Sequence, residues 1–198
     1  MNIQENFPLK TFNTFGVEAK AKYFAEVHSL EELKETLQFS YSPILVLGGG
    51  SNVLFTKDFE GLVIKLNLKG ISEENLDENH VLVSAKAGEN WHEFVLYTLS
   101  KNYGGLENLS LIPGNVGTCP IQNIGAYGTE IKDHFISCNA LNLENLEVEN
   151  LTLEQCKFGY RDSIFKTYAK GKYIILEVTF KLTTQNHHIK TEYGAIST

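Results

Sequence analysis

The sequence has few of the features that secretion, membrane insertion or metal binding require. Its three cysteines, Cys119, Cys138 and Cys156, are odd in number and lack the spacing of a CxxC pair or a zinc site, so we expect neither a disulfide framework nor a structural metal. The N-terminal stretch MNIQENFPLKTFNTFG has no basic segment followed by an apolar one, and no apolar run is long enough to span a membrane. These absences favour a cytoplasmic protein with no membrane partner.

Basic residues are also too few, and too scattered, to form a nucleic-acid surface. There are 17 Lys and Arg against 24 Asp and Glu, a formal net charge of −7. We therefore expect no nucleic-acid partner, and the acidic excess is typical of an ordinary soluble protein. At 198 residues with 42% hydrophobic content, the chain is long enough for one large or two small domains with a buried core.

Local patterns predict two helices. The run SLEELKETLQF has Leu30, Leu33 and Leu37 at helical spacing, and Ser29 and Glu32 stand where a capping box requires them. A second helix is expected after Asn90 as N-cap, with an apolar stripe formed by Trp91, Phe94, Val95, Thr98 and Leu99. Residues 152–158 could form a short helix as well.

Strand patterns occur in residues 44–47, 62–66, 81–87, 136–143 and 173–182. Alternation in the last of these places on one face Ile174, Leu176, Val178, Phe180 and Leu182. Strands and helices do not alternate regularly, which favours an α+β fold over a doubly wound one. A boundary near Asn108 would divide the chain into two small lobes, residues 1–107 and 108–184.

Three consecutive glycines follow the strand at residues 44–47. Gly48, Gly49 and Gly50 can take positive φ angles and bring backbone N–H groups together as an anion-binding nest, with side-chain donors from Ser51 and Asn52. The alternative is a tight turn with no ligand. A dinucleotide fingerprint needs a third glycine where the sequence has Val53, and no P-loop motif is present, so neither of those nucleotide sites is expected.

A second glycine-containing stretch, IPGNVGTCPIQNIGAY at residues 112–127, is irregular and apolar at once. Ile112, Pro113, Gly114 and Gly117 would allow a flat ligand to approach the backbone. The stretch also supplies apolar walls and polar edges, from Val116, Ile121, Ile124, Gln122, Asn123 and Tyr127. An apolar pocket with a few placed polar groups is typical of a cofactor site.

Four motifs together are more specific than either glycine stretch. NTFG (13–16), LGGGSN (47–52), GLENLSLIPGNVGTCPIQNIGAYG (105–128) and YRDSIFK (160–166) occur in the order and spacing of the UDP-N-acetylenolpyruvoylglucosamine reductase family. The sequence resembles this family over nearly its whole length, and PIQNIGAYG resembles its type I branch. The family consists of flavoproteins that complete the UDP-N-acetylmuramate precursor of bacterial peptidoglycan.

The resemblance implies a fold, two cofactors and a set of site residues. The fold would be the two-lobed FAD-binding domain of the vanillyl-alcohol-oxidase/p-cresol-methylhydroxylase type, with noncovalent FAD between the lobes and NADPH as hydride donor. Gly48 to Asn52 would hold the FAD diphosphate. The flavin would be lined by Ile112, Pro113, Gly114, Val116, Gly117, Gln122, Asn123, Gly125, Ala126 and Tyr127. Arg161 would be the catalytic arginine that polarises the substrate, with Tyr160 and Tyr193 as further substrate contacts.

The family continues beyond the point where this sequence ends. Its members have a third, substrate-binding domain with a catalytic serine and glutamate that match no position here, and residues 185–198 would be the start of that domain. Alternatives therefore stay open: a flavin-binding fragment without turnover, or another FAD oxidoreductase of the same fold. An arginine such as Arg161 is by itself more often a surface residue. The oligomeric state is not predicted.

Overall fold

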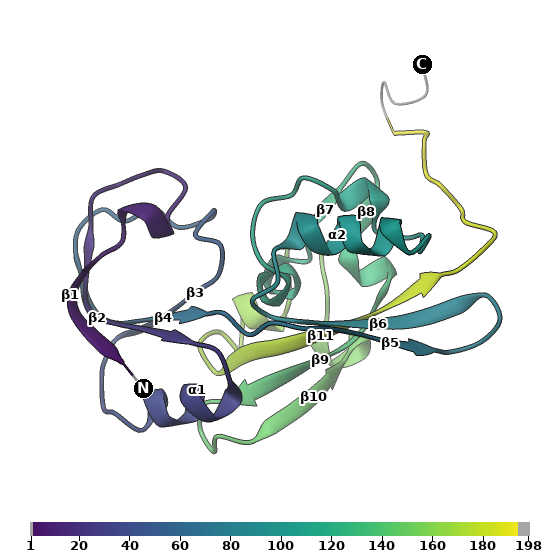
Figure 1. The fold of residues 1–198 in the computed structure, drawn as a ribbon. Helices are drawn as coiled ribbons and strands as arrows, with labels where there is room; N and C mark the ends of the chain where they lie inside the picture. Colours follow the sequence, from purple (N-terminus) through teal and green to yellow (C-terminus); the bar gives the residue numbers. More distant parts are fainter. Residues whose placement is uncertain (1, 194–198) are drawn as a thin grey trace.

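The computed structural model describes residues 2–193, and its N-terminal lobe is a four-stranded sheet in the order β1-β2-β4-β3. The strands are β1 (Ile3–Pro8), β2 (Lys20–Val27), β3 (Ile44–Leu47) and β4 (Phe59–Leu66). β4 pairs in parallel with both neighbours, β2 and β3, and α1 (Leu30–Leu37) connects β2 to β3. The sheet and α1 form one end of the molecule in Figure 1.

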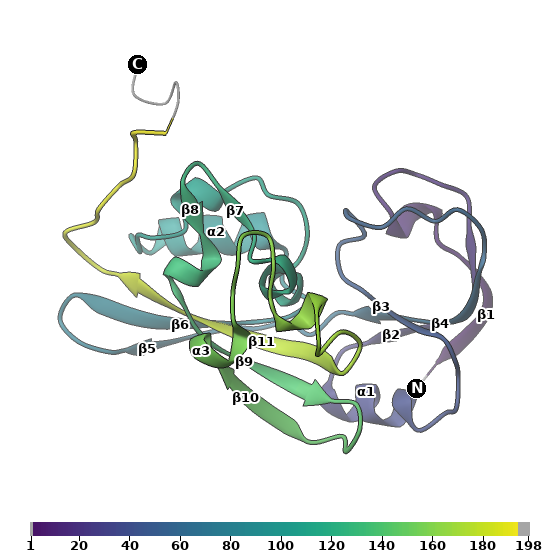
Figure 2. The same ribbon diagram turned by 180° about the vertical axis from the view of Figure 1, so that it is seen from behind.

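The second lobe is built on a five-stranded antiparallel sheet in the order β10-β9-β11-β6-β5. Its strands are β5 (Ile71–Asn75), β6 (His80–Lys86), β9 (Phe135–Asn142), β10 (Val148–Thr152) and β11 (Tyr173–Thr183). α2 (Trp91–Ser100) lies over this sheet in both views of the ribbon (Figures 1 and 2). This combination of separate sheets and few helices confirms the predicted α+β class.

Short elements fill the connections of the second lobe. They are the strands β7 (Gly125–Ala126) and β8 (Thr129–Glu130), the helix α3 (Leu153–Cys156), and the 3-10 helices η2 (Glu107–Leu109), η3 (Val116–Gln122), η4 (Ile131–Asp133) and η5 (Ile164–Lys166). In the first lobe, η1 (Lys10–Phe12) precedes β2. The irregular segment predicted at residues 112–127 therefore contains the 3-10 helix η3 and the short strand β7, joined by turns.

The two sheets divide the chain between β4 and β5, which is earlier than the sequence suggested. A boundary at 107/108 would assign β5, β6 and α2 to the first lobe, but β6 pairs with β11 and so belongs to the second sheet. The turn at Gly104–Gly105 resembles a linker in composition, yet Gly104 forms a β-bridge to Thr183 at the end of β11. Residues 104–105 therefore belong to the second lobe and do not separate the two sheets.

Both predicted helices begin where their caps indicate. The Ser29 side chain accepts a hydrogen bond from Glu32 N at 3.1 Å, and Glu32 in turn accepts from His28 N at 2.7 Å, one residue earlier than an ideal capping box. Asn90 accepts from the third residue of α2, Glu93, at 3.1 Å. The stripe predicted on α2 is buried except for Leu99, which is exposed.

A β-bulge near Ile175 and Glu177 changes which face of β11 carries each side chain. Val178, Phe180 and Leu182 pack in the core of the second lobe, where Phe180 contacts the rings of Trp91 and Phe94. Ile174 and Leu176 instead pack against residues of the first sheet and α1. The prediction that these five residues share one face is therefore wrong, because the bulge shifts the alternation by one residue.

Within residues 2–193, no helix is long and apolar enough to cross a membrane. All three cysteines are buried and have free thiols. Cys119 lies in the second-lobe core, where burial raises the pKa of its thiol well above the ordinary value. A buried, protonated thiol is a poor nucleophile, which agrees with noncovalent rather than covalent attachment of a flavin.

Candidate functional site

An open cleft of about 560 Å³ is lined by residues of both lobes, where β3 and β4 end and β11 begins. This volume lies within the range of about 300–1,000 Å³ that is common for small-molecule and cofactor sites. The residues that line it and were predicted from the sequence are Gly48, Gly49, Gly50, Ser51, Asn52, Ile112, Pro113, Gly117, Gln122, Gly125 and Arg161. The two glycine-containing stretches thus meet in one cleft.

The structure brings the two stretches into direct contact. Asn52 Nδ2 donates a hydrogen bond of 3.5 Å to Gln122 Oε1, between the turn after β3 and the end of η3. Gly114 does not line the cleft itself but lies against Gly49, whose Cα carries no side chain that would keep the two turns apart. A ligand in the cleft can therefore be contacted by both turns at once.

Two residues predicted as flavin contacts are buried away from the cleft. Val116 belongs to the core of the second lobe. Asn123 is fully buried, donates to Gly159 O at 2.9 Å and accepts from Lys132 N at 3.2 Å. The side chains of Val116 and Asn123 are therefore used inside the protein, and contact of either residue with a flavin stays a prediction from the family resemblance.

Four other predicted residues lie outside the cleft lining. Ala126 packs against the second-lobe core, and Tyr160 is exposed. Tyr127 and Tyr193 are also exposed, and their rings meet edge to face at 6.1 Å between centroids. The predicted contact of Tyr127 with the flavin and those of Tyr160 and Tyr193 with the substrate therefore stay predictions.

The glycine turn is most tightly constrained at Gly50. Gly50 has a φ of 67°, and a Cβ there would lie 2.0 Å from Phe12 O. Gly48 and Gly49 do not have positive φ angles, so of the three glycines that could take this conformation only Gly50 does. Gly50 O accepts from Thr14 N at 3.1 Å, so the predicted NTFG motif supports the turn from behind.

The backbone amides of the turn are available to a ligand. Among the hydrogen bonds of the described residues, none is donated by the N–H groups of Gly49, Gly50, Ser51 or Asn52. Backbone N–H groups without a protein acceptor are rare unless they face water or a ligand. Adjacent amides at the rim of an open cleft are suited to binding an anion.

A cation supports this turn from behind, and the sequence motifs did not indicate it. Lys65 in β4 donates from Nζ to Gly48 O. Lys65 is about half buried, and burial lowers its pKa, while the charge of Glu26 opposes that effect. The turn therefore has a positive charge on the side of its carbonyl groups.

Arg161 is the only arginine in the sequence and lies in a tight turn with a φ of 51°. Its guanidinium donates to Gly125 O at the cleft and lies 5.9 Å from the centroid of the Tyr160 ring. The turn is held by a pair of backbone hydrogen bonds between Gly159 and Asp162. Ser163 Oγ further ties it to Ile121 O at 2.7 Å. This arrangement presents a permanent positive charge at one end of the cleft.

The apolar wall of the cleft comes mostly from residues that the sequence did not single out. They include Val46 and Leu47 in β3, Leu66 in β4, and Tyr173, Ile174 and Ile175 at the start of β11. Ile121 and Ile124 were expected as apolar walls and line the cleft. The contribution of β11 could not be foreseen, because it depends on the bulge that turns this end of the strand toward the first lobe.

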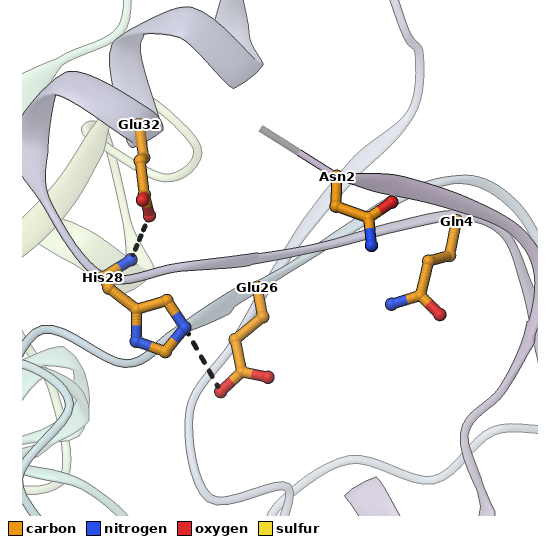
Figure 3. A pocket seen from close by; sticks show the side chains of 5 residues that line it. All are labelled: Asn2, Gln4, Glu26, His28 and Glu32. Carbon is orange, nitrogen blue, oxygen red and sulfur yellow. Dashed lines mark hydrogen bonds and ion pairs between the residues drawn. The ribbon is translucent and has the colours of Figure 1, made fainter.

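A second, polar hollow lies at the start of β1, the end of β2 and α1, and is lined by Asn2, Gln4, Glu26, His28 and Glu32 (Figure 3). Glu26 lies 4.0 Å from His28 Nε2, and Glu32 accepts from the backbone of His28, so these groups mainly contact each other. Two carboxylates at this hollow would repel a diphosphate. Residues 2–193 contain no group of three or more His, Cys, Asp and Glu side chains placed to hold a metal ion.

Comparison with known proteins connects the cleft to flavin binding. The family model described as "FAD binding domain" matches residues 21–149, which include the glycine turn and all of residues 112–127. The chain is 57% identical to the UDP-N-acetylenolpyruvoylglucosamine reductase of Flavobacterium johnsoniae over 99% of its own length and 58% of that protein. It thus spans little more than half the length of the curated relatives that it matches.

Solved structures show the same fold. The crystal structure of UDP-N-acetylenolpyruvylglucosamine reductase (MurB) from Thermus caldophilus matches 98% of this chain and 65% of its own, with a TM-score of 0.74 and 26% identity. A VAO-type flavoprotein from Myceliophthora thermophila matches 83% of this chain and 32% of its own, with a TM-score of 0.58 and 16% identity. The second likeness concerns the fold alone and confirms the predicted two-lobed type.

Proposed function

The chain belongs to the family of FAD-binding domains, and from this premise we propose that it binds FAD noncovalently in the cleft as part of a UDP-N-acetylenolpyruvoylglucosamine reductase. The reaction would be the NADPH-dependent reduction of that substrate to UDP-N-acetylmuramate in peptidoglycan precursor synthesis. The observation that carries the proposal is the meeting of the glycine turn and residues 112–125 in one cleft. Three buried, free thiols agree with a reducing, cytoplasmic location.

The residues of the cleft fit the parts of FAD. Unpaired amides at Gly49 to Asn52 suit the diphosphate, since hydrogen bonds to a charged acceptor contribute about 1.5–3 kcal/mol each. The apolar walls from β3, Ile121 and Ile124 suit a flat ring system. Gln122 and Asn52 place polar side chains between these two regions. Ile112, Pro113 and Gly117 complete the lining.

FAD bound in the cleft would supply the hydride-transfer chemistry between NADPH and the enolpyruvyl group of the substrate. The chain's own contribution is to hold the ligand, exclude water from the ring and stabilise charge. Arg161 would bind and polarise the substrate carboxylate with a rigid, permanently charged fork. Tyr160, which is exposed beside the guanidinium, would contact the substrate on the solvent side.

A second candidate is a flavin-binding module that does not turn over the substrate by itself. The observation that favours it is that the chain matches only 58% of the length of its curated relatives. The cleft is also open, so a ligand bound there is accessible from outside the two lobes. In this case the substrate would be handled together with parts of a longer protein.

The test is a visible absorption spectrum of the purified chain after addition of FAD and removal of the excess by gel filtration. A retained flavin spectrum that disappears on acid precipitation supports noncovalent binding, and a colourless chain contradicts both candidates. Anaerobic addition of NADPH with the enolpyruvyl substrate then separates the two. Bleaching of the flavin followed by reoxidation by substrate supports the reductase, whereas an unchanged spectrum supports the module.

A further inference from the structure

Lys65 occupies an unusual position relative to the glycine turn. It lies on β4, where the parallel register pairs it with Leu47, the last residue of β3. From there its ammonium group reaches the carbonyl oxygen of the next residue, Gly48. The side chain is neither a cleft-lining residue nor fully exposed, so its charge is held behind the turn and partly shielded from solvent.

The geometry of the peptide bond determines what this contact does. The only cis peptide among the described residues joins Ser42 to Pro43, so the Gly48–Gly49 bond is trans. In a trans peptide, C=O and N–H point in opposite directions. A hydrogen bond from Lys65 to Gly48 O therefore directs Gly49 N–H to the other side of the turn. That N–H donates to no acceptor within residues 2–193, and Gly49 lines the cleft.

Charge makes this arrangement more than a structural contact. Arg161 is the only cationic residue among those that line the cleft, and it lies in a different turn from the glycines. A cation that donates to a peptide oxygen polarises the whole peptide and strengthens the hydrogen bond that its N–H can form. In surroundings less polar than water this effect acts over a longer range than it does at an exposed site.

We propose that Lys65 is a positioning residue for the FAD diphosphate: its ammonium group fixes the Gly48–Gly49 peptide and transmits positive charge through it to the bound anion. This inference deepens the proposed function and rests on the diphosphate lying at the glycine turn. Lys65 and the unpaired amides of the turn then form one anion site with a remote cation. Burial of the charge before the ligand binds is offset when the diphosphate arrives.

Lys69, in the connection between β4 and β5, provides a matched control. It also donates to a glycine carbonyl, Gly88 O, at 2.7 Å. The N–H that follows, on Glu89, is already bonded to Lys86 O at 3.0 Å, and Lys69 does not line the cleft. Loss of Lys69 should therefore remove the same kind of contact without weakening an anion site.

The experiment compares FAD affinity of Lys65→Met, Lys65→Gln, Lys65→Arg and Lys69→Met with the unsubstituted chain, by flavin fluorescence quenching at low and high salt. We expect Lys65→Met and Lys65→Gln to weaken binding about tenfold or more at low salt, in the range for hydrogen bonds to charged groups. Lys65→Arg should retain most of the affinity, and Lys69→Met should stay within about twofold. High salt should reduce the difference between Lys65→Gln and the unsubstituted chain, because the difference is electrostatic.

Thermal unfolding of each variant shows whether a loss of FAD affinity comes with a loss of stability, as a purely structural role of Lys65 would require. If Lys65→Met lowers stability too far to be titrated, Lys65→Gln retains a hydrogen-bond donor without charge and carries the test. Equal FAD affinity and equal salt dependence in Lys65→Gln and the unsubstituted chain would overturn the proposal. Absence of FAD binding to the unsubstituted chain would instead refute the proposed function, so the two failures are distinguishable.

Discussion

Gly49 and Gly114 place the backbones of the two turns in contact. A Cβ on Gly49 would lie 3.0 Å from Gly114 Cα and 2.9 Å from Asn115 Oδ1. Gly114 has a φ of 124°, a conformation that side chains rarely allow. Because one partner of the clash is backbone, rotation of a side chain cannot relieve it. The cleft therefore depends on the absence of side chains at both positions.

We predict that Gly49→Val abolishes FAD binding. The two methyl groups of valine would push the turn away from Gly114 and displace the amides that face the cleft. Equilibrium dialysis against FAD measures the loss, and unfolding in urea reports whether the chain still folds. Gly171→Asn is the control, since a Cβ there meets nothing within 4 Å and asparagine tolerates the φ of 76°. Full flavin retention in Gly49→Val would contradict the role assigned to the turn.

Features that depend on neighbouring residues could be predicted from the sequence. Ser29 and Asn90 cap their helices as expected because a cap requires only a polar side chain and the amides of the following turn. The strand over residues 44–47 was also found, because its apolar run ends at the glycines. The two glycine stretches were joined in one site by resemblance to a family rather than by physical pattern.

Features that depend on residues far apart in the sequence could not be predicted. The bulge in β11 is a property of its pairing with β9, and it decides that Ile174 faces the first lobe. The role of Lys65 depends on the parallel pairing of β3 and β4, which no local pattern reveals. Asn123 was placed in the flavin site because its motif resembles that of a ligand contact, although its amide is used inside the protein.

Asn123 holds the turn that carries Arg161, and Asn123→Ala should destabilise the protein. The substitution would leave Lys132 N without its acceptor and Gly159 O with only the N–H of Asp162, and an unsatisfied polar group costs about 1–3 kcal/mol. We expect the free energy of unfolding in urea to fall by about 1–3 kcal/mol. Asn145→Ala is the control, because Asn145 is exposed and bonds only to nearby Glu147. Weaker FAD binding with unchanged stability would instead indicate a direct ligand contact.

Arg161→Ala should reduce substrate reduction about 10²–10³-fold while leaving FAD bound, in any longer protein that contains this chain and turns over the substrate. The guanidinium donates to the protein backbone, at Gly125 O. Its loss should therefore change the flavin spectrum only slightly. Arg161→Lys should restore little, because lysine lacks the planar fork. Stopped-flow measurement of flavin reoxidation by substrate gives the rate. Lys170→Ala, a loss of an exposed cation nearby, should be silent. Near-normal rates in Arg161→Ala would show that a residue other than Arg161 polarises the substrate.

Glu73 should make the protein sensitive to alkaline pH. Tyr97 donates its hydroxyl to Glu73, as does Tyr103 at 2.8 Å, and the hydrogen bond to the carboxylate raises the pKa of Tyr97 to about 12. An unfolded tyrosine has a pKa of about 10, so between pH 10 and about 12 the folded state holds more protons than the unfolded state. The free energy of unfolding should therefore decrease as pH rises through this window.

Replacing the Glu73 carboxylate tests whether it causes the predicted decrease in the free energy of unfolding at alkaline pH. Glu73→Gln removes the charge that opposes ionisation, so the pKa of Tyr97 should fall toward its ordinary value and the alkaline loss of stability should become smaller. Phenolate absorbance followed against pH gives the tyrosine ionisation, and urea unfolding at several alkaline pH values gives the stability. Glu74→Gln, an exposed neighbour on β5, should leave both curves unchanged. Identical alkaline curves for Glu73→Gln and the unsubstituted chain would show that the hydroxyl of Tyr97 is not bonded to Glu73 in solution.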